Sequence, residues 1–364
     1  MNAKANTNPL AILLNKELQG EVLFDDFSRG RYSTDASIYQ IMPLGVVVPK
    51  SEEDVQITLQ IAKDAGIPVL PRGGGTSQNG QTVNEALVID TSKYLRNITD
   101  FNADKRTVSV QPGLVLDPLN KFLKPHGLFY PVDVSTANRA TLGGMTGNNS
   151  CGSRSIRYGN MVHNVEAIDA LLADGSSARF QALTDDAARG DLIKRMLRLG
   201  EREKEEINHR FPDLLRRVGG YNIDALIAKD PNMSHLLVGS EGTLAFFQKI
   251  HLNLQPLPRH KTLGICHFPT FYAAMDATQH IVKLKPSAVE LVDRTMINLA
   301  RDIPMFKASV DQFVVGEPEA LLLVEFSGEN EEAQLSSLRD LVTLMNDMGF
   351  VDAVVEATDP TFQQ

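Results

Sequence analysis

A loop of small residues, "PRGGGTSQNG" (Pro71–Gly80), places the strongest single constraint on how this chain can fold. Three consecutive glycines cost conformational entropy on folding, so a fold retains them where the backbone needs unusual dihedral angles or approaches another group closely. The backbone N–H groups of such a run can point into one concavity and bind anionic oxygens, and Thr76 and Ser77 add hydroxyl donors. A pyrophosphate fits this description, although a glycine-rich surface turn would have the same composition.

The segments before the loop predict a strand–helix–strand unit. Leu44–Val48 is rich in β-branched residues and predicts a strand. Ser51, with Asp54 three residues later, resembles a capping box for a helix that ends at Gly66. A second short strand, Ile67–Leu70, then leads directly into the glycine loop. The glycines therefore lie at the end of the second strand of the unit.

A second glycine-rich segment, "ATLGGMTGNNSCGS" (residues 140–153), lies among further predicted elements. We expect strands at 85–90 and 105–113, a helix at 116–127, a hairpin at 164–180 that turns at Asp174-Gly175, and strand structure from 235 to 254. Residues 185–230 are rich in charge and helix formers, which predicts a helical insertion with a solvated face. Two glycine loops in one domain indicate a long ligand.

Two familiar phosphate-binding motifs do not account for these loops. "GTSQNGQT" (residues 75–82) nearly matches the P-loop, but Gln81 stands at the lysine position, so the β- and γ-phosphates would lack their cationic partner. The Rossmann fingerprint also fails, because Gln78 stands where its third glycine belongs and no helix pattern follows. A nucleoside triphosphatase and a Rossmann dehydrogenase are both disfavoured.

The amino-acid composition excludes several kinds of partner and indicates a location. The formal net charge of the 364 residues is -9, which argues against a nucleic-acid partner. The two cysteines, Cys151 and Cys266, lie far apart and form no metal-binding motif, so we expect no metal site. The first residues lack a signal-peptide pattern and no apolar stretch reaches membrane-spanning length, which favours a cytoplasmic location.

The C-terminal third predicts a second αβ domain. Pro256 and Pro258 mark a domain boundary. Beyond it we expect strands at 262–268, 288–292, 320–326 and 352–356, with helices at 272–284 and 331–348. This order resembles a ferredoxin-like split βαβ half-sandwich, after which the chain stops without a further closing strand or capped helix.

Four motifs occur in an order that resembles one flavoprotein superfamily: "PRGGGTS", "STANRATLGGMTGNNSCGSRSIRYG", "LLADGS" and "VGSEGTLA". They are similar to the FAD-binding domain of the vanillyl-alcohol oxidase and p-cresol methylhydroxylase (PCMH) superfamily. Within it, they look most like the FAD-linked 2-hydroxy-acid dehydrogenases, which include D-lactate dehydrogenase, the glycolate oxidase flavin subunit and D-2-hydroxyglutarate dehydrogenase. The resemblance implies an α+β chain of three parts: a helical extension (1–39), a two-subdomain PCMH-type FAD-binding domain (40–256, with the insertion at about 185–230) and the start of a truncated ferredoxin-like substrate cap (257–364).

The resemblance also implies which residues bind FAD. In the first loop they are Arg72, Gly73, Gly74, Gly75, Thr76, Ser77 and Gln78, which would wrap the pyrophosphate. Pro131 and Asp133 would run beside the flavin, and the second segment would contribute Thr141, Gly143, Gly144, Gly147, Asn148, Ser150 and Gly152. Glu241 and Gly242 would close on the cofactor through their main chain. Members of the superfamily that attach flavin covalently often carry histidine where this chain has Thr76, so we expect dissociable, non-covalent FAD.

The implied reaction is oxidation of a small 2-hydroxy acid of the D-lactate, glycolate or D-2-hydroxyglutarate type, with hydride transfer to flavin N5 and electrons passed to an Fe–S or quinone acceptor. In the family, the catalytic histidines, any metal and any Fe–S clusters come from parts beyond these residues, which implies an N-terminal fragment located in the cytoplasm or at the inner face of the membrane. Two alternatives stay open: a non-catalytic FAD-binding module, and another enzyme of the same fold, such as an enolpyruvyl reductase or an aldonolactone oxidase.

Overall fold

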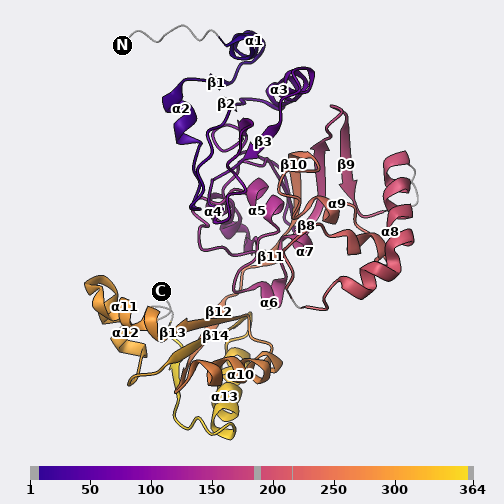
Figure 1. Ribbon diagram of the computed structural model, residues 1–364. Coiled ribbons are helices and arrows are strands. Elements are labelled where there is room, and N and C mark those ends of the chain that lie inside the picture. The colour runs from indigo at the N-terminus through magenta and orange to yellow at the C-terminus, as the bar shows by residue number, and fades with distance from the viewer. Residues whose placement is uncertain (1–7, 184–189, 215, 360–364) are drawn as a thin grey trace. The chain divides into compact units, whose positions relative to one another are not determined.

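The computed structural model describes residues 8–183, 190–214 and 216–359 (Figure 1). Contacts between Cα atoms divide the chain into two units. Unit 1 contains Met1–Gly152 and Asn160–Gln255, and unit 2 contains Ser153–Gly159 and Pro256–Gln364. The short segment Ser153–Gly159, with helix α6 (Ser155–Tyr158), therefore belongs to unit 2 although the predicted domain boundary placed it in the FAD-binding domain.

Unit 1 begins with a four-stranded sheet in the order β1-β2-β4-β3 (Glu21–Leu23, Gly45–Val48, Leu87–Asp90, Val69–Arg72). Strands β2, β4 and β3 are parallel, and β1, from the expected helical extension, pairs antiparallel with β2. Helices α1 (Pro9–Glu17) and α3 (Glu52–Asp64) pack on one face through Leu14 and Ala62. The predicted strand–helix–strand unit is present, and Ser51 Oγ accepts the Asp54 N–H at 3.1 Å as the N-cap of α3.

The second sheet of unit 1 has five antiparallel strands in the order β5-β6-β10-β8-β9 (Ile98–Asn102, Thr107–Val110, Phe246–Asn253, Val165–Leu171, Ser177–Gln181). Its β8–β9 hairpin turns at Asp174-Gly175 as expected, and Gly175 adopts the left-handed φ of 88°. Buried and partly buried residues alternate along the second half of β10, so one face of this sheet is apolar.

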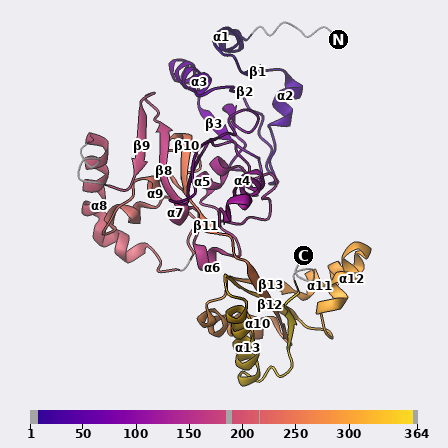
Figure 2. The same cartoon turned by 180° about the vertical axis from the view of Figure 1, so that it is seen from behind.

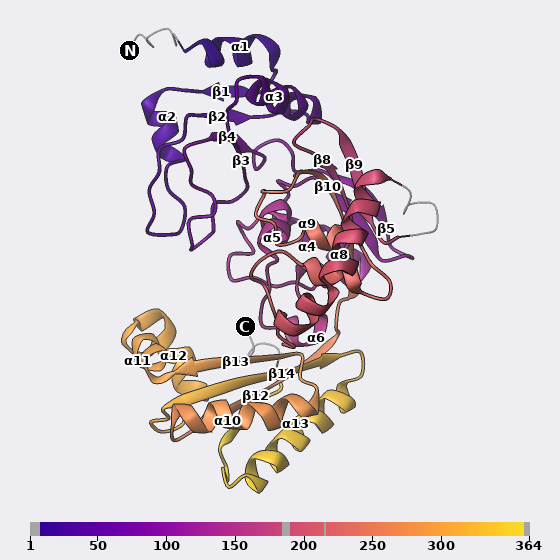
Figure 3. The ribbon, with the colours of Figure 1, turned by 45° about the vertical axis from the view of Figure 1, so that its right-hand side comes forward.

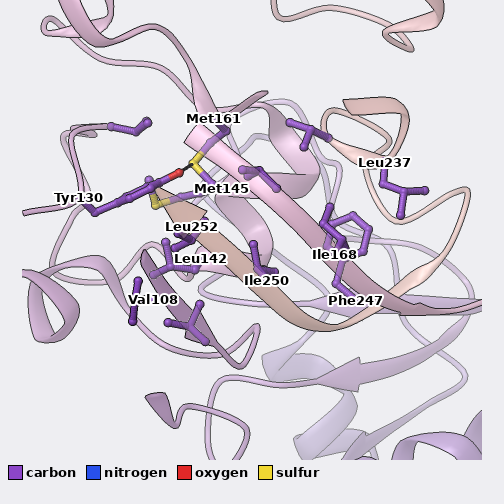
Figure 4. Packing of buried hydrophobic residues seen from close by; sticks show 14 of the residues in the cluster. Val108, Tyr130, Leu142, Met145, Met161, Ile168, Leu237, Phe247, Ile250 and Leu252 are labelled. Carbon is purple, nitrogen blue, oxygen red and sulfur yellow. Dashed lines mark hydrogen bonds between the residues drawn. The ribbon is translucent and has the colours of Figure 1, made fainter. Parts of the chain in front are cut away.

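The apolar face of the second sheet carries the main core (Figure 4). Helices α4 (Leu116–Leu123), α5 (Leu142–Asn148) and α7 (Met161–Asn164) pack side chains into it, and Leu142 and Met145 lie against Ile250 and Leu252. Tyr130 is buried in this cluster, and its hydroxyl donates to the sulfur of Met161 at 3.0 Å. Helix α5, which carries the second glycine segment, is thereby fixed to the sheet.

Helix α8 (Asp191–Arg210; Figure 2) occupies the charged stretch that was expected to be helical. Its charged residues are mostly exposed to solvent. Part of that stretch, residues 185–189 and 215, lies outside the described residues. The prediction of strand structure from residue 235 is wrong for residues 235–245, because Ser234–Leu237 form the single turn α9 and strand β10 begins only at Phe246. The Asn222 side chain donates to Val238 O at 2.8 Å and His235 O at 3.2 Å, which satisfies carbonyls at the end of this turn.

Unit 2 contains a four-stranded antiparallel sheet in the order β13-β14-β12-β15 (Ala288–Asp293, Ala320–Gly328, His260–Phe268, Val354–Ala357). Helices α10 (Phe271–Ile281) and α13 (Glu331–Asp347) cover one face (Figure 3), which gives the ferredoxin-like arrangement with β15 as its fourth strand. Helices α11 (Arg294–Asp302) and α12 (Pro304–Phe313), which were not predicted, pack on the other face through Ile297 and Val310.

The remaining elements of the described chain are short. They are α2 (Asp26–Arg31), the two-stranded ladder of β7 (Leu128–Phe129) with β11 (Gln255–Pro256), and 3₁₀ turns at Lys124–His126, Ile223–Ile227 and Val282–Leu284. No helix within the described ranges is long and apolar enough to cross a membrane.

Candidate cofactor site

The first glycine loop leaves β3 and lies directly against the second glycine segment. A Cβ atom added at Gly73 would come within 2.0 Å of Thr141 Oγ1, and one at Gly74 within 2.3 Å of the carbonyl oxygen of Arg139. Gly75 has a φ of 64°, which L side chains rarely adopt. Each of the three glycines is therefore required by a close approach or by its backbone conformation.

The backbone N–H groups of this loop have no protein partner. Within the described part of the chain, none of the six amides from Gly73 to Gln78 donates a hydrogen bond to another protein group. Backbone amides in folded proteins almost always have a partner, which is the protein, water or a ligand. Six consecutive free amides beside two hydroxyl side chains, Thr76 and Ser77, form the kind of donor-rich surface that binds phosphate oxygens.

The Arg72 side chain is directed away from this surface. Its Nη1 donates to Tyr32 O at 3.0 Å and to Thr82 O at 2.9 Å, and its Nη2 donates to Thr34 O at 2.7 Å. The guanidinium also lies over the Tyr32 ring, 5.3 Å from the ring centroid. The Arg72 guanidinium thus binds carbonyl groups of the protein. If this loop binds a pyrophosphate, as the resemblance implies, the backbone amides of the loop would make the contacts.

The second glycine segment uses its first amides internally. Thr141 is the N-cap of α5, and its Oγ1 accepts the Gly144 N–H at 3.2 Å. Leu142 N donates to Leu114 O and Gly143 N to Pro112 O, each at 2.8 Å. Gly144 remains exposed, so the segment presents an open surface rather than free N–H groups.

The end of this segment is shaped by its neighbours. Asn148 Nδ2 donates to Ser150 Oγ at 3.0 Å. Gly152 lies so close to Asp133 that an added Cβ atom would come within 1.7 Å of its carbonyl oxygen, and Pro131 is buried two residues before Asp133. The structure thus brings the stretch of Pro131 and Asp133 against the second segment, and only glycine fits at position 152.

The turn at Glu241-Gly242 closes on both glycine segments. Glu241 N donates to Gly147 O at 2.9 Å, and a Cβ atom added at Gly242 would lie 3.3 Å from the ring of Pro71. Both turn residues have positive φ, 52° for Glu241 and 75° for Gly242. A left-handed conformation is uncommon for glutamate and costs free energy, which the contacts of this turn offset.

Burial by surrounding protein atoms raises the pKa of the Glu241 carboxyl from 4.5 to about 7, and an interaction with Gln81 acts in the opposite direction. The residue is still partly open to solvent, so the desolvation is local. Two buried polar side-chain atoms in the described residues have no hydrogen-bond partner, and both lie at this place: Gln81 Oε1 and Ser240 Oγ. Buried polar atoms without a partner are rare and indicate a missing ligand or water.

The structure brings together the segments that the resemblance implies, and it adds neighbouring residues that were not singled out. The first loop, the 131–133 stretch, the second segment and the 241–242 turn all meet in unit 1. Gln81, Ser240, Tyr32 and Asp35 were not singled out. A signal existed for the first two, since each adjoins a recognised motif, whereas nothing in the local sequence marks Tyr32 and Asp35.

These residues fit an FAD molecule. The free amides of the first loop match the oxygen atoms of a pyrophosphate, and the close packing of its glycines against the second segment sets where those amides lie. The unpartnered Gln81 and Ser240 atoms offer an acceptor and a donor to its polar groups. No group of three or more metal-ligating side chains occurs within the described residues.

Two family models match the chain. Residues 43–181 match the FAD binding domain, and residues 257–364 match the C-terminal domain of FAD linked oxidases. Among solved structures, an alkyldihydroxyacetonephosphate synthase superposes with a TM-score of 0.72 at 17% identity, and covers 100% of this chain and 64% of the synthase chain. At that identity the similarity shows the fold.

Curated relatives point in the same direction. The D-2-hydroxyglutarate dehydrogenase of Haemophilus influenzae is 33% identical over 87% of this chain and 33% of its own length. The D-lactate dehydrogenase of Archaeoglobus fulgidus is 30% identical over 80% of this chain and 56% of its own length, and a glycolate oxidase subunit of Bacillus subtilis is 27% identical over 94% and 62%. The chain thus spans about a third of the length of the first of these. With this fold and cofactor site, the chain belongs to the FAD-linked oxidases of the vanillyl-alcohol oxidase and p-cresol methylhydroxylase superfamily, whose cofactor is FAD.

Proposed function

We propose that the protein oxidises a small 2-hydroxy acid to the corresponding 2-oxo acid with dissociable FAD as cofactor. The observation that carries the proposal is the set of six free amides at the first glycine loop, closed by the second segment and the 241–242 turn. The choice of substrate class is supported by the relatives, whose names specify D-2-hydroxyglutarate, D-lactate and glycolate. In each of these acids the hydroxyl-bearing carbon adjoins a carboxylate.

The site would hold FAD through neutral groups. The amides of Gly73–Gln78, with the hydroxyls of Thr76 and Ser77, would bind the pyrophosphate, and the exposed Gly144 would lie along the cofactor. When bound, FAD would accept the hydride that leaves the α-carbon of the substrate. The role of this part of the chain is to position the cofactor and to keep its contacts with protein free of competing water.

Four basic side chains of unit 2, those of Arg259, Lys261, Arg294 and Arg301, already lie near carboxylates of the protein. Arg259 lies 3.3 Å from Glu329, Arg301 lies 3.0 Å from Glu317, and Arg294 pairs with Glu319. A carboxylate of the substrate would have to compete with these pairs. We therefore assign neither the substrate's carboxylate partner nor the catalytic base to a described residue.

The electron acceptor that we propose is an Fe–S group or a quinone, reached in the cytoplasm or at the inner face of the membrane. The two cysteines, Cys151 and Cys266, are both free thiols in the structure. An Fe–S cluster needs several cysteine ligands, so such a cluster would have to be held by other polypeptide.

Turnover with an artificial dye acceptor tests this function. The FAD-reconstituted protein is assayed with the D and L forms of lactate and 2-hydroxyglutarate and with glycolate, and we expect reduction of the dye with a D acid or with glycolate. Reduction of the cofactor by NADPH would instead favour an enolpyruvyl reductase, and dye reduction with an aldonolactone would favour an aldonolactone oxidase. Bound FAD with no reduction by any of these compounds would favour a non-catalytic FAD-binding module.

A further inference from the structure

A segment that precedes the matched FAD-binding model holds the first glycine loop in place. We call residues 32–42 the strap. The family match begins at residue 43, so the strap lies outside it. The strap folds back on itself through an antiparallel bridge between Thr34 and Gln40 and through a hydrogen bond of 2.9 Å from Ile41 N to Ser33 O.

Arg72 connects the strap to both ends of the glycine loop. The loop runs from Gly73 to Gln81, so Arg72 and Thr82 flank it. One nitrogen of the guanidinium, Nη1, donates to Thr82 O and to Tyr32 O, and the other donates to Thr34 O. The loop is therefore closed at its base by a side chain that the strap carbonyls also hold. Tyr32 is fixed in turn, since its hydroxyl donates to Asp90 Oδ2 at 2.7 Å.

Asp35 makes a second connection at the end of the loop. Its Oδ2 accepts from Thr82 Oγ1 at 3.0 Å and from Thr82 N at 3.4 Å, and its Oδ1 accepts from Ser37 N at 2.8 Å. Although burial acts against it, the hydrogen bonds from Ser37 and Thr82 hold the pKa of Asp35 below its ordinary value. Asp35 is therefore ionised at neutral pH, and with Asp90 it balances the buried charge of Arg72.

Two further contacts hold the loop, at Gly75 and at Gly80. Ala36 N donates to Gly75 O at 3.2 Å. Gly80, with a φ of 77°, lies against the Tyr39 ring, where an added Cβ atom would come within 2.6 Å of Cδ2. All these strap contacts use carbonyl groups, loop ends or glycine faces, and none uses the amides from Gly73 to Gln78. The strap thus holds the loop without occupying the backbone N–H groups from Gly73 to Gln78.

We propose that the strap is a positioning element of the cofactor site, in which Asp35 and Tyr32 keep the loop amides assembled for the FAD pyrophosphate. The inference rests on the proposed FAD-dependent function and adds residues outside the matched domain to the site. An assembled loop binds its ligand without first having to be ordered, so loosening the strap lowers the affinity for FAD. Among variants of one binding site, differences in affinity lie mostly in the dissociation rate, so we expect the change there.

The test measures FAD binding by flavin fluorescence in Asp35→Ala, Asp35→Asn and Thr82→Val. We expect Asp35→Ala to raise the dissociation rate about tenfold, with smaller increases for Asp35→Asn, which retains acceptor and donor atoms, and for Thr82→Val. Ile38→Ser is the matched control, because Ile38 lies in the strap and is 96% exposed, and it should bind FAD like the wild type.

Thermal unfolding of the FAD-free proteins separates positioning from folding. The inference predicts that Thr82→Val and Asp35→Asn keep a cooperative transition close to that of the wild type while releasing FAD faster. Wild-type dissociation rates in all three variants would overturn the inference and leave the proposed function intact. Failure of the wild type itself to bind FAD would overturn the proposed function, and this inference with it.

Discussion

Arg154 and Glu325, 171 residues apart in the sequence, form a bidentate ion pair within unit 2. Arg154 Nε donates to Glu325 Oε1 at 3.1 Å, and Nη2 donates to Oε2 at 2.9 Å. Arg157 on the same short segment donates to Ser287 Oγ at 2.7 Å. These contacts attach the segment that directly follows the second glycine loop to the sheet of unit 2.

Loss of the Arg154 side chain should destabilise unit 2. Arg154→Met leaves the largely buried Glu325 without its bidentate partner. We expect the free energy of unfolding to fall by about 2 kcal/mol, a loss between those typical of exposed and of buried ion pairs. Arg259→Met is the control, because its pair with Glu329 is exposed, and it should change stability by less than about 0.5 kcal/mol. Since the chain has no tryptophan, far-UV circular dichroism during urea unfolding is the measurement. Equal losses in the two variants would contradict the structural role of the pair.

The same pair should weaken in acid. Burial acts to raise the pKa of Glu325, but the hydrogen bonds and charge of Arg154 hold it below 4.5. A carboxyl whose pKa is lowered by folding stabilises the native state above its unfolded pKa, and this contribution disappears as the pH falls below about 4.5. Arg154→Met should therefore show a smaller loss of stability than the wild type between pH 5 and pH 3, in the same unfolding experiment.

Alanine at position 74 should impair FAD binding. The new Cβ atom would lie 2.3 Å from the backbone oxygen of Arg139, so the first glycine loop must shift away from the second segment. We expect the dissociation constant for FAD to rise at least about tenfold. Gly30→Ala is the matched control, because no heavy atom lies within 4 Å of an added Cβ there. Similar FAD affinity in Gly74→Ala and Gly30→Ala would show that the packed loop is not the cofactor site.

Glu241 should make stability depend on pH near neutrality. Its folded pKa, about 7, exceeds the ordinary value of 4.5, so the native state binds more protons than the unfolded state between these values. Stability therefore falls as the pH rises from about 4.5 to 7, by on the order of 1 kcal/mol after allowance for solvent screening. Glu241→Gln, which stays neutral, should lack this fall in thermal melts across that range. An identical pH profile for the two proteins would refute the raised pKa.

His251 links three strands of the second sheet and should matter for stability alone. Its Nδ1 lies 2.7 Å from Ser109 Oγ, and its Nε2 lies 3.0 Å from Asp169 Oδ2. Although this resembles a hydrolase triad, Ser109 is only 7% exposed, and the cluster lies on the face opposite Ile250, away from α5. His251→Leu should cost about 1 to 2 kcal/mol and leave FAD affinity unchanged, whereas exposed His209→Leu should change neither. A loss of FAD affinity in His251→Leu would contradict this assignment.

The sequence predicted the fold where local signals agree. The Ser51 cap and the glycine after α3 defined the first strand–helix–strand unit, and Asp174-Gly175 defined the hairpin. Helices α11 and α12 were missed although the sequence carries signals for both, since Asp293 caps the first, Pro304 opens the second, and α11 is amphipathic with Ile297 in the core. Local sequence signals therefore gave the positions of the predicted helices and strands well, but the prediction did not include every helix of the structure.

The sequence indicated which segments meet at the candidate site, but it did not indicate where their individual side chains point. Arg72 lies within the recognised motif, yet the direction of its guanidinium depends on carbonyls some 40 residues earlier in the chain. The left-handed backbone of Glu241 likewise depends on its contact with Gly147, which no local pattern encodes. Contacts between distant segments decide which groups a ligand meets, and these require the structure.

In the proposed function, the two glycine segments hold an FAD molecule that a 2-hydroxy acid reduces. The most direct test is the absorbance spectrum of the FAD-reconstituted protein during anaerobic addition of D-2-hydroxyglutarate, D-lactate or glycolate. We expect flavin bands that bleach with one of these acids and return when an oxidant is added. Absence of flavin bands after reconstitution would contradict the cofactor site, and bands that stay oxidised with every acid would contradict the proposed reaction.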